Sequence, residues 1–275
     1  MVNLTNFAKE GVLGFEIPQE IKEGEVAVGI AVTTEDQIGR LCIATERYQL
    51  EGYLDDVENV TVDCEPELLI EEEIEDFEER LTPAQLEKFH ESGLVVHFPL
   101  GSAVENFYID KYLWRSVPIV AKDSTGYIAS ARLILTNGEN SLPTLTAPEI
   151  VLYDDWKDEA GKAQAEMSQL AKVKGGHSGA MVGMLRIAQL YSKKAEIDSW
   201  IATTDNRVVK LLNGLMKFNI LQIGDPVRYL GSESTPGLIN IEGSLQSIKT
   251  NGSQELERFL RGEQNVKGFE WYKGV

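Results

Sequence analysis

A hairpin sequence near the middle of the chain limits the kind of sheet that this protein can build. Two apolar runs, Val117–Lys122 and Tyr127–Leu135, flank the short polar stretch Asp123–Gly126. Such a stretch between two strand-like runs is typical of a β-hairpin. A further alternating segment, Ala165–Val173, predicts another strand. The centre of the chain is therefore expected to form a sheet with antiparallel neighbours.

Strand and helix patterns alternate on both sides of this hairpin. Before it, Glu25–Val32 predicts a strand, and Thr33–Asp36 caps a helix that ends at Gly52. After it, we expect a helix over Gly179–Lys194, a strand over Ile197–Ala202, a helix from Thr204 or Asp205 to Phe218, and strands near Ile220–Ile223, Val227–Leu230 and Leu238–Ser244. This order predicts an α/β sandwich with a mixed sheet.

Two segments fall outside this alternation. The acidic stretch Cys64–Ser92 predicts two short helices, the second ended by Gly93, and belongs to an acidic helical insertion at about residues 55–110. Residues 1–250 are expected to form the main domain. Residues 251–275 are expected to form a C-terminal tail with a helix at Gln254–Arg261 and the docked aromatic residues Phe269, Trp271 and Tyr272.

The charge of the chain is large and uneven. The net charge is −18, and residues 1–110 hold 26 acidic against 6 basic side chains. Phosphates would be repelled by this part, so the charge argues against a nucleic-acid partner. The run Glu71–Glu79 has two interpretations, a docking surface for a basic protein or a solvated helix face.

Composition narrows the class of protein further. The chain has no apolar run long enough to span a membrane and no signal-peptide pattern at Met1–Glu20, so a cytoplasmic protein is expected. The two cysteines, Cys42 and Cys64, form no metal pattern with the three histidines, and we interpret them as free thiols.

Four stretches, in order and spacing, resemble acyl-homoserine-lactone synthases and the related N-acyl amino acid synthases of the GNAT superfamily. They cover about two-thirds of the chain and are Ile38–Leu54, Ser116–Leu135, Ala165–Ala171 and Trp200–Gly214. The resemblance implies a GNAT-like mixed central sheet flanked by helices. It also implies an N-acyltransferase that moves an acyl group from acyl-CoA or an acyl carrier protein to a small amine or amino acid, without a metal.

The same resemblance assigns roles to individual residues. Glu166 occupies the position of the family's acid and is the candidate base for the attacking amine, with Ser168 beside it. A solvent-facing or ion-paired glutamate is the alternative. The candidate substrate-binding residues are Arg40, Arg47, Arg132 and Thr203. Gln169 departs from the arginine that is usual in the family.

A glycine-rich turn follows Glu166 and has a physical interpretation of its own. Small residues at a helix start expose backbone N–H groups that attract phosphate, and no acidic residue occurs between Glu166 and Glu196. The residues expected to hold the phosphopantetheine arm of the donor are Leu170, Lys172, Lys174, Gly175, Gly176, Ser178 and Gly179. The glycines lie out of the usual GNAT register, and an ordinary flexible loop is the alternative.

Other functions fit less of the sequence. The irregular glycine register, Gln169 and the missing GNAT tyrosine are compatible with a non-catalytic binding or structural protein, such as an assembly or virion component, on the same scaffold. Tyr191 and Tyr229 are the candidate replacements for that tyrosine, and His177 is a weaker candidate base. A nucleotide-dependent enzyme fits the sequence poorly, because neither a Walker loop nor a Gly-x-Gly-x-x-Gly after a strand is present.

Overall fold

The computed structural model of the chain describes residues 14–62, 73–100, 103–136, 142–229 and 231–275. A large sheet has the strand order β10-β11-β8-β7-β6-β5-β1-β12, and β9 pairs with β11. The pairs β7–β8 and β1–β12 are parallel and the others antiparallel, so the expected mixed sheet is confirmed. Its strands are β1 (Val26–Ile30), β5 (Ser116–Asp123), β6 (Gly126–Leu135), β7 (Ala165–Lys172), β8 (Ser199–Asp205), β9 (Ile220–Gln222), β10 (Val227–Tyr229), β11 (Ser232–Asn240) and β12 (Tyr272–Lys273).

The predicted hairpin is formed by β5 and β6. Asp123 lies opposite Gly126, and Asp123 Oδ1 accepts the N–H of Thr125 at 2.8 Å. Gly126 has φ +129°, a backbone angle that favours glycine. The turn chemistry therefore agrees with the sequence, and the two strands supply the middle of the sheet.

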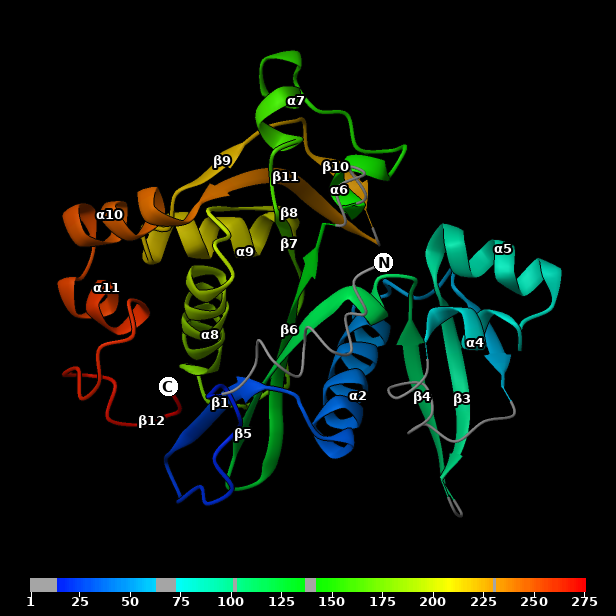
Figure 1. Ribbon diagram of the computed structural model, residues 1–275, viewed down its shortest axis with the longest axis horizontal. Coiled ribbons are helices and arrows are strands. Elements are labelled where there is room, and N and C mark those ends of the chain that lie inside the picture. The colour runs from blue at the N-terminus through cyan, green and yellow to red at the C-terminus, as the bar shows by residue number, and fades with distance from the viewer. Residues whose placement is uncertain (1–13, 63–72, 101–102, 137–141, 230) are drawn as a thin grey trace.

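Two helices cover the centre of the sheet from opposite sides, α2 (Thr34–Leu50) and α8 (Ala180–Lys194) (Figure 1). Thr33 caps α2 by accepting the N–H of Asp36, and the chain leaves the helix at Gly52 with φ +74°. The buried face of α8 packs on the main apolar core through Met184, Leu185, Ile187, Ala188 and Tyr191. Both helices lie where the sequence predicted them.

The acidic insertion is a small α/β unit with its own core. Helices α4 (Ile74–Glu78) and α5 (Pro83–Ser92) agree with the prediction, and Gly93 ends α5 with φ +78°. The prediction of a helical insertion was incomplete, because β2 (Glu58–Thr61), β3 (Leu94–Leu100) and β4 (Ala103–Ile109) form a second sheet. Cys64 and the first two residues of Glu71–Glu79 lie outside the described residues, and Cys42 is half-buried on α2.

The C-terminal segment packs on α8 and extends the sheet. The predicted strand Leu238–Ser244 was wrong in its second half, because the Asn240 side chain accepts the N–H of Gly243 and starts α10 (Ile241–Asn251). Helix α11 (Gln254–Leu260) follows, and Phe259 stacks on Phe269 at 4.1 Å between ring centroids. The aromatic cluster is therefore docked, as expected.

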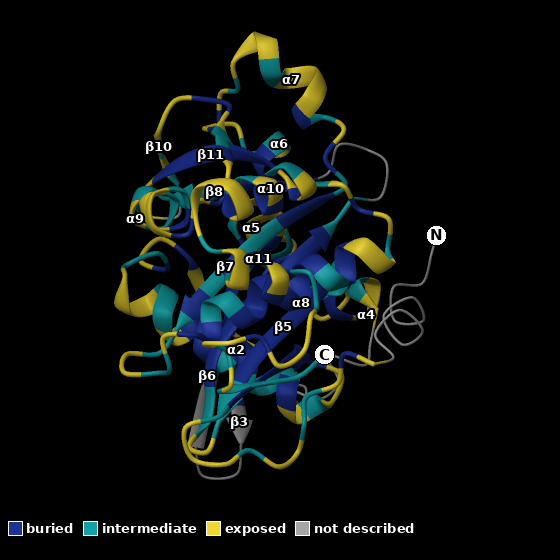
Figure 2. Cartoon of the chain, turned by 90° about the vertical axis from the view of Figure 1, so that its left-hand side faces the viewer, coloured by how far each residue is buried: buried dark blue, intermediate teal, exposed yellow. Residues whose placement is uncertain are grey.

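Shorter helices complete the described structure: α6 (Pro143–Thr146), α7 (Asp154–Ala160), α9 (Asn206–Lys210) and a π-helical turn (Leu211–Leu215). Figure 2 shows the central strands buried and α7 largely exposed at the edge of the molecule. Within the described ranges, no helix combines the length and apolar character of a membrane span, and no group of three potential metal ligands occurs.

Candidate active site between the parted strands

The two parallel strands in the middle of the large sheet pair only where they begin. Ala165 lies opposite Trp200 and Glu166 opposite Ile201, and the ladder between β7 and β8 stops there. Both strands nevertheless continue, β7 to Lys172 and β8 to Asp205. From Met167 onward, the edge of β7 that faces β8 therefore has no strand partner in the described part of the chain.

A bulge in β7 accompanies this parting. On the other side of β7, Arg132 lies opposite Ser168, but Ser130 lies opposite Ala171, so the pairing with β6 shifts in between. Gln169 takes up the shift with φ +52°, and its buried side chain accepts a hydrogen bond from Arg40 Nη1 at 3.1 Å. A bulge increases the local twist of a strand, which turns β7 away from β8.

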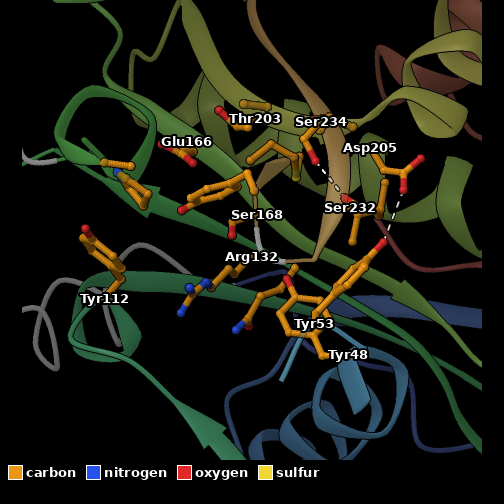
Figure 3. Close-up of a pocket in the computed structure, with 18 of the residues that line it drawn as sticks. Tyr48, Tyr53, Tyr112, Arg132, Glu166, Ser168, Thr203, Asp205, Ser232 and Ser234 are labelled. Carbon is orange, nitrogen blue, oxygen red and sulfur yellow. Dashed lines mark hydrogen bonds between the residues drawn. The ribbon is translucent and has the colours of Figure 1, made fainter. Parts of the chain in front are cut away.

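A cavity of about 880 Å³ occupies the opening between the two strands (Figure 3). Side chains alternate between the faces of a strand, and the alternation gives the cavity two different ends. Glu166, Ser168 and Thr203 line it on one face, whereas Met167 and Ala202 belong to the core under α8 on the other. The cavity thus passes through the sheet from a polar to an apolar chamber.

The apolar chamber lies between β7, β8, α8 and the segment from α9 to β9. Its lining residues are Met167, Leu170, Leu185, Trp200, Ala202, Val208, Leu212, Phe218, Ile220 and Ile239. Trp200 is fully buried and is held in place by a hydrogen bond from its indole N–H to Ser192 Oγ at 2.9 Å. This chamber matches an aliphatic chain better than a polar ligand.

Glu166 is a buried carboxyl group at the point where the strands part. Its side chain is 3% exposed, and its Oε2 accepts the N–H of Thr144 at 2.8 Å. Burial raises the pKa of Glu166 to about 7, although hydrogen bonds from Thr144 and the charges of Arg132 and Arg115 oppose this rise. A carboxyl group with this pKa can both take and give a proton near neutral pH.

The residues next to Glu166 differ in how well the sequence identified them. Ser168 and Thr203, both expected in the site, line the cavity and are half-buried. Thr144 was not expected, yet its hydroxyl lies 2.8 Å from that of Thr203. Thr144 lies 22 residues before Glu166 in a short helix without any motif, so no sequence signal pointed to it.

Arg132 is buried at the polar end and paired with a residue that the sequence did not single out. Its guanidinium donates two hydrogen bonds to the carboxylate of Asp110, at 2.9 and 2.5 Å. Arg40 lies nearby, and burial together with the charge of Arg132 lowers the pKa of Arg40 to about 9. Within the described residues, Arg40 Nε and Nη2 have no hydrogen-bond partner. These two arginines carry more positive charge than Asp110 compensates.

Arg47 and Tyr53 belong to a bridge across the mouth of the cavity. Arg47 pairs with Glu51 at 2.7 Å, and Glu51 also pairs with Arg207 at 3.2 Å. The Tyr53 hydroxyl donates to Asp205 at 3.2 Å, which links the end of α2 to the end of β8 (Figure 3). Arg47 therefore lines the cavity but already has a carboxylate partner.

The glycine-rich turn after β7 does not line the cavity. The two residues just before it that were expected to hold the donor, Leu170 and Lys172, do line the cavity. Gly175 is exposed and has φ +85°, and Lys174 and Ser178 are also exposed. The Lys172 ammonium group donates to the carbonyl oxygens of Val173 and Gly176, at 3.3 and 2.7 Å. This part of the turn keeps an accessible main chain.

The start of α8 is covered by the protein itself. His177 Nδ1 accepts the N–H of Gly179 at 3.0 Å, and the His177 carbonyl accepts that of Ala180 at 3.2 Å. A side chain on Gly179 would overlap the indole of Trp271, whose ring also lies 4.9 Å from that of His177. The first two amides of this helix start therefore already have acceptors.

The basic residues after Glu166 do not form one surface. Arg186 is buried and donates to the main-chain carbonyls of Phe259, Glu263 and Val275. Lys193 and Lys194 lie in the last turn of α8, a full helix length from Lys172. The basic residues of the acid-free segment between Glu166 and Glu196 therefore lie apart from one another in the structure.

The two tyrosines considered from the sequence have different surroundings. Tyr191 is buried in the core under α8. Tyr229 lines the cavity, and burial together with the Glu166 charge raises the pKa of its phenol. Of the two, only Tyr229 can therefore contact a molecule in the cavity.

The fold and the site together define an α/β protein with a mixed sheet and a two-chambered cavity where its parallel strands part. No protein-family model matches the chain, and no curated protein matches its sequence. Similar solved structures include FeeM, an N-acyl amino acid synthase from uncultured soil microbes (12% identity, 81% of this chain and 94% of that chain, TM-score 0.49).

Two further similar structures are those of LasI and TofI. LasI, described as an AHL synthase, is 12% identical over 87% of this chain and 97% of that chain, with a TM-score of 0.45. TofI, in a complex with an inhibitor and MTA, is 19% identical over 56% of this chain and 81% of that chain, with a TM-score of 0.43. FeeM and LasI carry the names of the two groups of synthases that the four sequence stretches resemble.

Proposed function

We propose that this chain is an N-acyltransferase that moves the acyl group of a thioester, carried by CoA or an acyl carrier protein, to a small amine or amino acid. One observation carries the proposal: the cavity crosses the sheet where β7 and β8 part, and the buried carboxyl of Glu166 lies at the polar side of the crossing. An acyl chain suits the apolar chamber and an amine the polar one. The reacting carbonyl then lies between them, next to Glu166.

Glu166 supplies the proton acceptor in this reaction. An amine attacks a thioester only in its neutral form, and a carboxylate within reach can remove its proton. With a pKa of about 7, Glu166 is about half ionised at neutral pH and still basic enough to accept a proton. Its buried position protects it from pairing with a surface base.

The free edge of β7 supplies the stabilisation of negative charge. As the amine adds, the thioester oxygen becomes an oxyanion, which main-chain N–H groups stabilise well when water is excluded. From Met167 to Lys172, the edge of β7 toward β8 has no strand partner among the described residues. Its N–H groups border the cavity next to Glu166.

The donor arm fits one part of the glycine-rich turn and not another. Leu170 and Lys172 line the cavity, and Lys174 and Gly175 are exposed just beyond them, so these residues suit a phosphopantetheine arm that leaves the opening. The amides of Gly179 and Ala180 do not fit a phosphate, because His177 already occupies them. The proposal therefore assigns no phosphate to the start of α8.

Acyl transfer can be tested directly. Octanoyl-CoA and acetyl-CoA are each incubated with a mixture of the twenty amino acids, thiol release is followed with a disulfide dye, and amides are identified by mass spectrometry. We expect amide formation that Glu166→Gln abolishes and that Glu159→Gln, an exposed matched control on α7, leaves unchanged. Amide formation that is equal in both variants would contradict the proposal, as would no amide with any donor.

A non-catalytic binding protein on the same scaffold is the second candidate. The observation in its favour is the capped start of α8, where His177 and Trp271 replace the open amides expected of a CoA-binding turn. This candidate predicts that octanoyl-CoA or a free fatty acid binds in calorimetric titrations without any amide product. The same incubation with mass spectrometry separates the two candidates.

A further inference from the structure

Gln169 is a buried residue at the bulge of β7, and it lines the cavity between the parted strands. It is 5% exposed, and its backbone has φ +52°, which is uncommon for a residue other than glycine. Because Gln169 and Leu170 together lie opposite Ala131 of β6, the alternation of side chains along β7 is interrupted there. The Gln169 side chain reaches α2, on the side of the sheet opposite α8. It therefore shares the polar face of β7 with its neighbour Ser168 (Figure 3).

Arg40 fixes which end of the Gln169 amide faces the cavity. Arg40 Nη1 donates to Gln169 Oε1 at 3.1 Å, and both side chains are buried. A guanidinium can only donate hydrogen bonds, so the amide oxygen is turned toward Arg40 and the NH₂ group away from it. Gln169 Nε2 has no acceptor within the described residues and, unlike Arg40 Nε and Nη2, is not fully enclosed by protein. The NH₂ group therefore faces the cavity that Gln169 lines.

The charge of Arg40 strengthens this NH₂ group as a donor. Arg40 is 1% exposed and is not among the described residues that line the cavity. A cation that donates to the amide oxygen polarises the amide, and linked hydrogen bonds strengthen one another where water is excluded. Gln169 thus presents part of the positive charge of Arg40 to the cavity, while the guanidinium stays behind the cavity wall.

We propose that the Gln169 NH₂ group is a side-chain donor of the oxyanion hole and donates a hydrogen bond to the carbonyl oxygen of the bound thioester. The inference rests on the proposed acyl transfer and adds a side chain to the main-chain edge of β7. As the amine nitrogen bonds to the thioester carbon, a carbonyl electron pair moves onto the oxygen, next to Gln169. The amine proton goes to Glu166. The electron pair returns as the carbon–sulfur bond breaks and the thiolate leaves, so Gln169 keeps its protons throughout.

Two charged donors that line the same cavity already have acceptors. The Arg132 guanidinium donates two hydrogen bonds to the Asp110 carboxylate, and the Lys172 ammonium group donates to two carbonyl oxygens. A substrate oxygen would have to compete with these acceptors. The Gln169 NH₂ group gains a hydrogen bond when a carbonyl oxygen arrives, and it gives up none within the described part of the protein.

The kinetics of a donor-free variant test this role. Transfer from octanoyl-CoA is measured for the wild type, Gln169→Met and Gln169→Glu. The control is Gln189→Met, at a buried glutamine of α8 outside the cavity lining. Gln169→Met keeps the length of the side chain but cannot donate, and Gln169→Glu presents a carboxylate that repels an oxyanion.

Loss of one oxyanion donor should appear in kcat, because the donor acts mainly in the transition state. We expect Gln169→Met to lower kcat about 100-fold, with the KM for octanoyl-CoA within about 3-fold of the wild-type value. Gln169→Glu should lower kcat further, and Gln189→Met should leave it unchanged. An unchanged kcat in Gln169→Met, or a rise in KM alone, would overturn the proposed role.

Infrared spectroscopy separates failure of this role from failure of acyl transfer. Octanoyl-CoA labelled with carbon-13 at its carbonyl is bound without an amine. A hydrogen bond weakens the carbonyl double bond, so the stretch should lie at lower frequency in the wild type and Gln189→Met than in Gln169→Met. Equal frequencies in all three would overturn the role of Gln169 even in a protein that transfers acyl groups. A lowered stretch without transfer would overturn only the proposed function, and absence of octanoyl-CoA binding would overturn both.

Discussion

The strand opening beside Glu166 and the glycine-rich turn before α8 contrast in how their main-chain groups are used. In the opening, the edge of β7 lacks a strand partner from Met167 onward, and a cavity fills the space. At the start of α8, His177 and Trp271 occupy the groups that a ligand would need. Each segment has a feature expected of a binding site: the opening has a buried carboxyl group beside an unpaired strand edge, and the turn has glycines at the start of a helix. The edge of β7 in the opening is left for a ligand, whereas the N–H groups of Gly179 and Ala180 at the start of α8 already have acceptors within the protein.

This difference shows that small residues alone do not make a binding site. The glycines before α8 allow a close approach of the main chain, but an aromatic ring of the same protein makes that approach. In the opening, by contrast, a bulge and a ladder that stops early create an unfilled edge next to a buried carboxyl group. The predictions below test which of the two segments carries the reaction.

Loss of the Glu166 carboxylate should have the largest effect. Glu166→Gln keeps the size of the side chain but cannot accept the amine proton, so kcat/KM should fall between about 100- and 10,000-fold. In the wild type, kcat/KM should rise with pH and level off above about pH 7, because the ionised form is the active one. Steady-state rates from pH 5 to 9 check both points. If Glu166→Gln keeps the wild-type rate and pH profile, Glu166 is not the proton acceptor of the reaction.

The same substitution should stabilise the fold at high pH. The pKa of Glu166 is about 7 in the folded protein against an ordinary 4.5, so the folded state binds this proton more tightly. The penalty for the buried charge is absent below pH 4.5, grows as pH rises to 7, and is then constant at about 3 kcal/mol. Urea unfolding should show Glu166→Gln more stable than the wild type at pH 8 and close to it at pH 4. Equal differences at both pH values would refute the burial argument.

Filling the apolar chamber should separate long from short donors. Ala202 is buried and lines this chamber, so Ala202→Phe removes space for an acyl chain. Each buried methylene contributes about 0.8 kcal/mol, and exclusion of four would weaken octanoyl-CoA binding by about 3 kcal/mol. Acetyl-CoA binding should change little. Calorimetry with both donors makes the comparison, and equal weakening of the two would show that the chain does not occupy this chamber.

A side chain at Gly179 should affect stability and leave catalysis alone. Gly179→Ala would overlap the Trp271 indole, and such overpacking costs about 1–3 kcal/mol. Replacement of Trp271 by Leu in the same chain should restore part of this stability. The expected readout is a lower urea midpoint with an unchanged kcat/KM for octanoyl-CoA. A large fall in kcat/KM with normal stability would instead make the start of α8 part of the site.

The sequence predicted the parts of this structure that depend on neighbouring residues. Asp123–Gly126 encodes its own turn, and Thr33 caps α2 through a residue three positions away. Glu166 was found because a motif surrounds it. Each of these signals involves residues that are close together in the chain, so it can be recognised from the sequence alone.

The missed features depend on residues that are far apart in the chain. Asp110 pairs with Arg132 across 22 positions, and Thr144 reaches Thr203 across 59. Trp271 covers Gly179 only because β12 joins the edge of the sheet beside β1. Neither a motif nor a periodicity marks such contacts, since they arise from the way the sheet brings distant segments together. The capped turn was therefore the feature that sequence patterns described least well.

A photo-crosslinking experiment locates the reacting group most directly. A CoA thioester with a diazirine at the end of its acyl chain is bound, irradiated and mapped by peptide mass spectrometry. The account predicts labels on the lining of the apolar chamber, at residues such as Met167, Leu212 and Phe218. Labels on the turn at 174–179 or on Trp271, with none between β7 and β8, would contradict it.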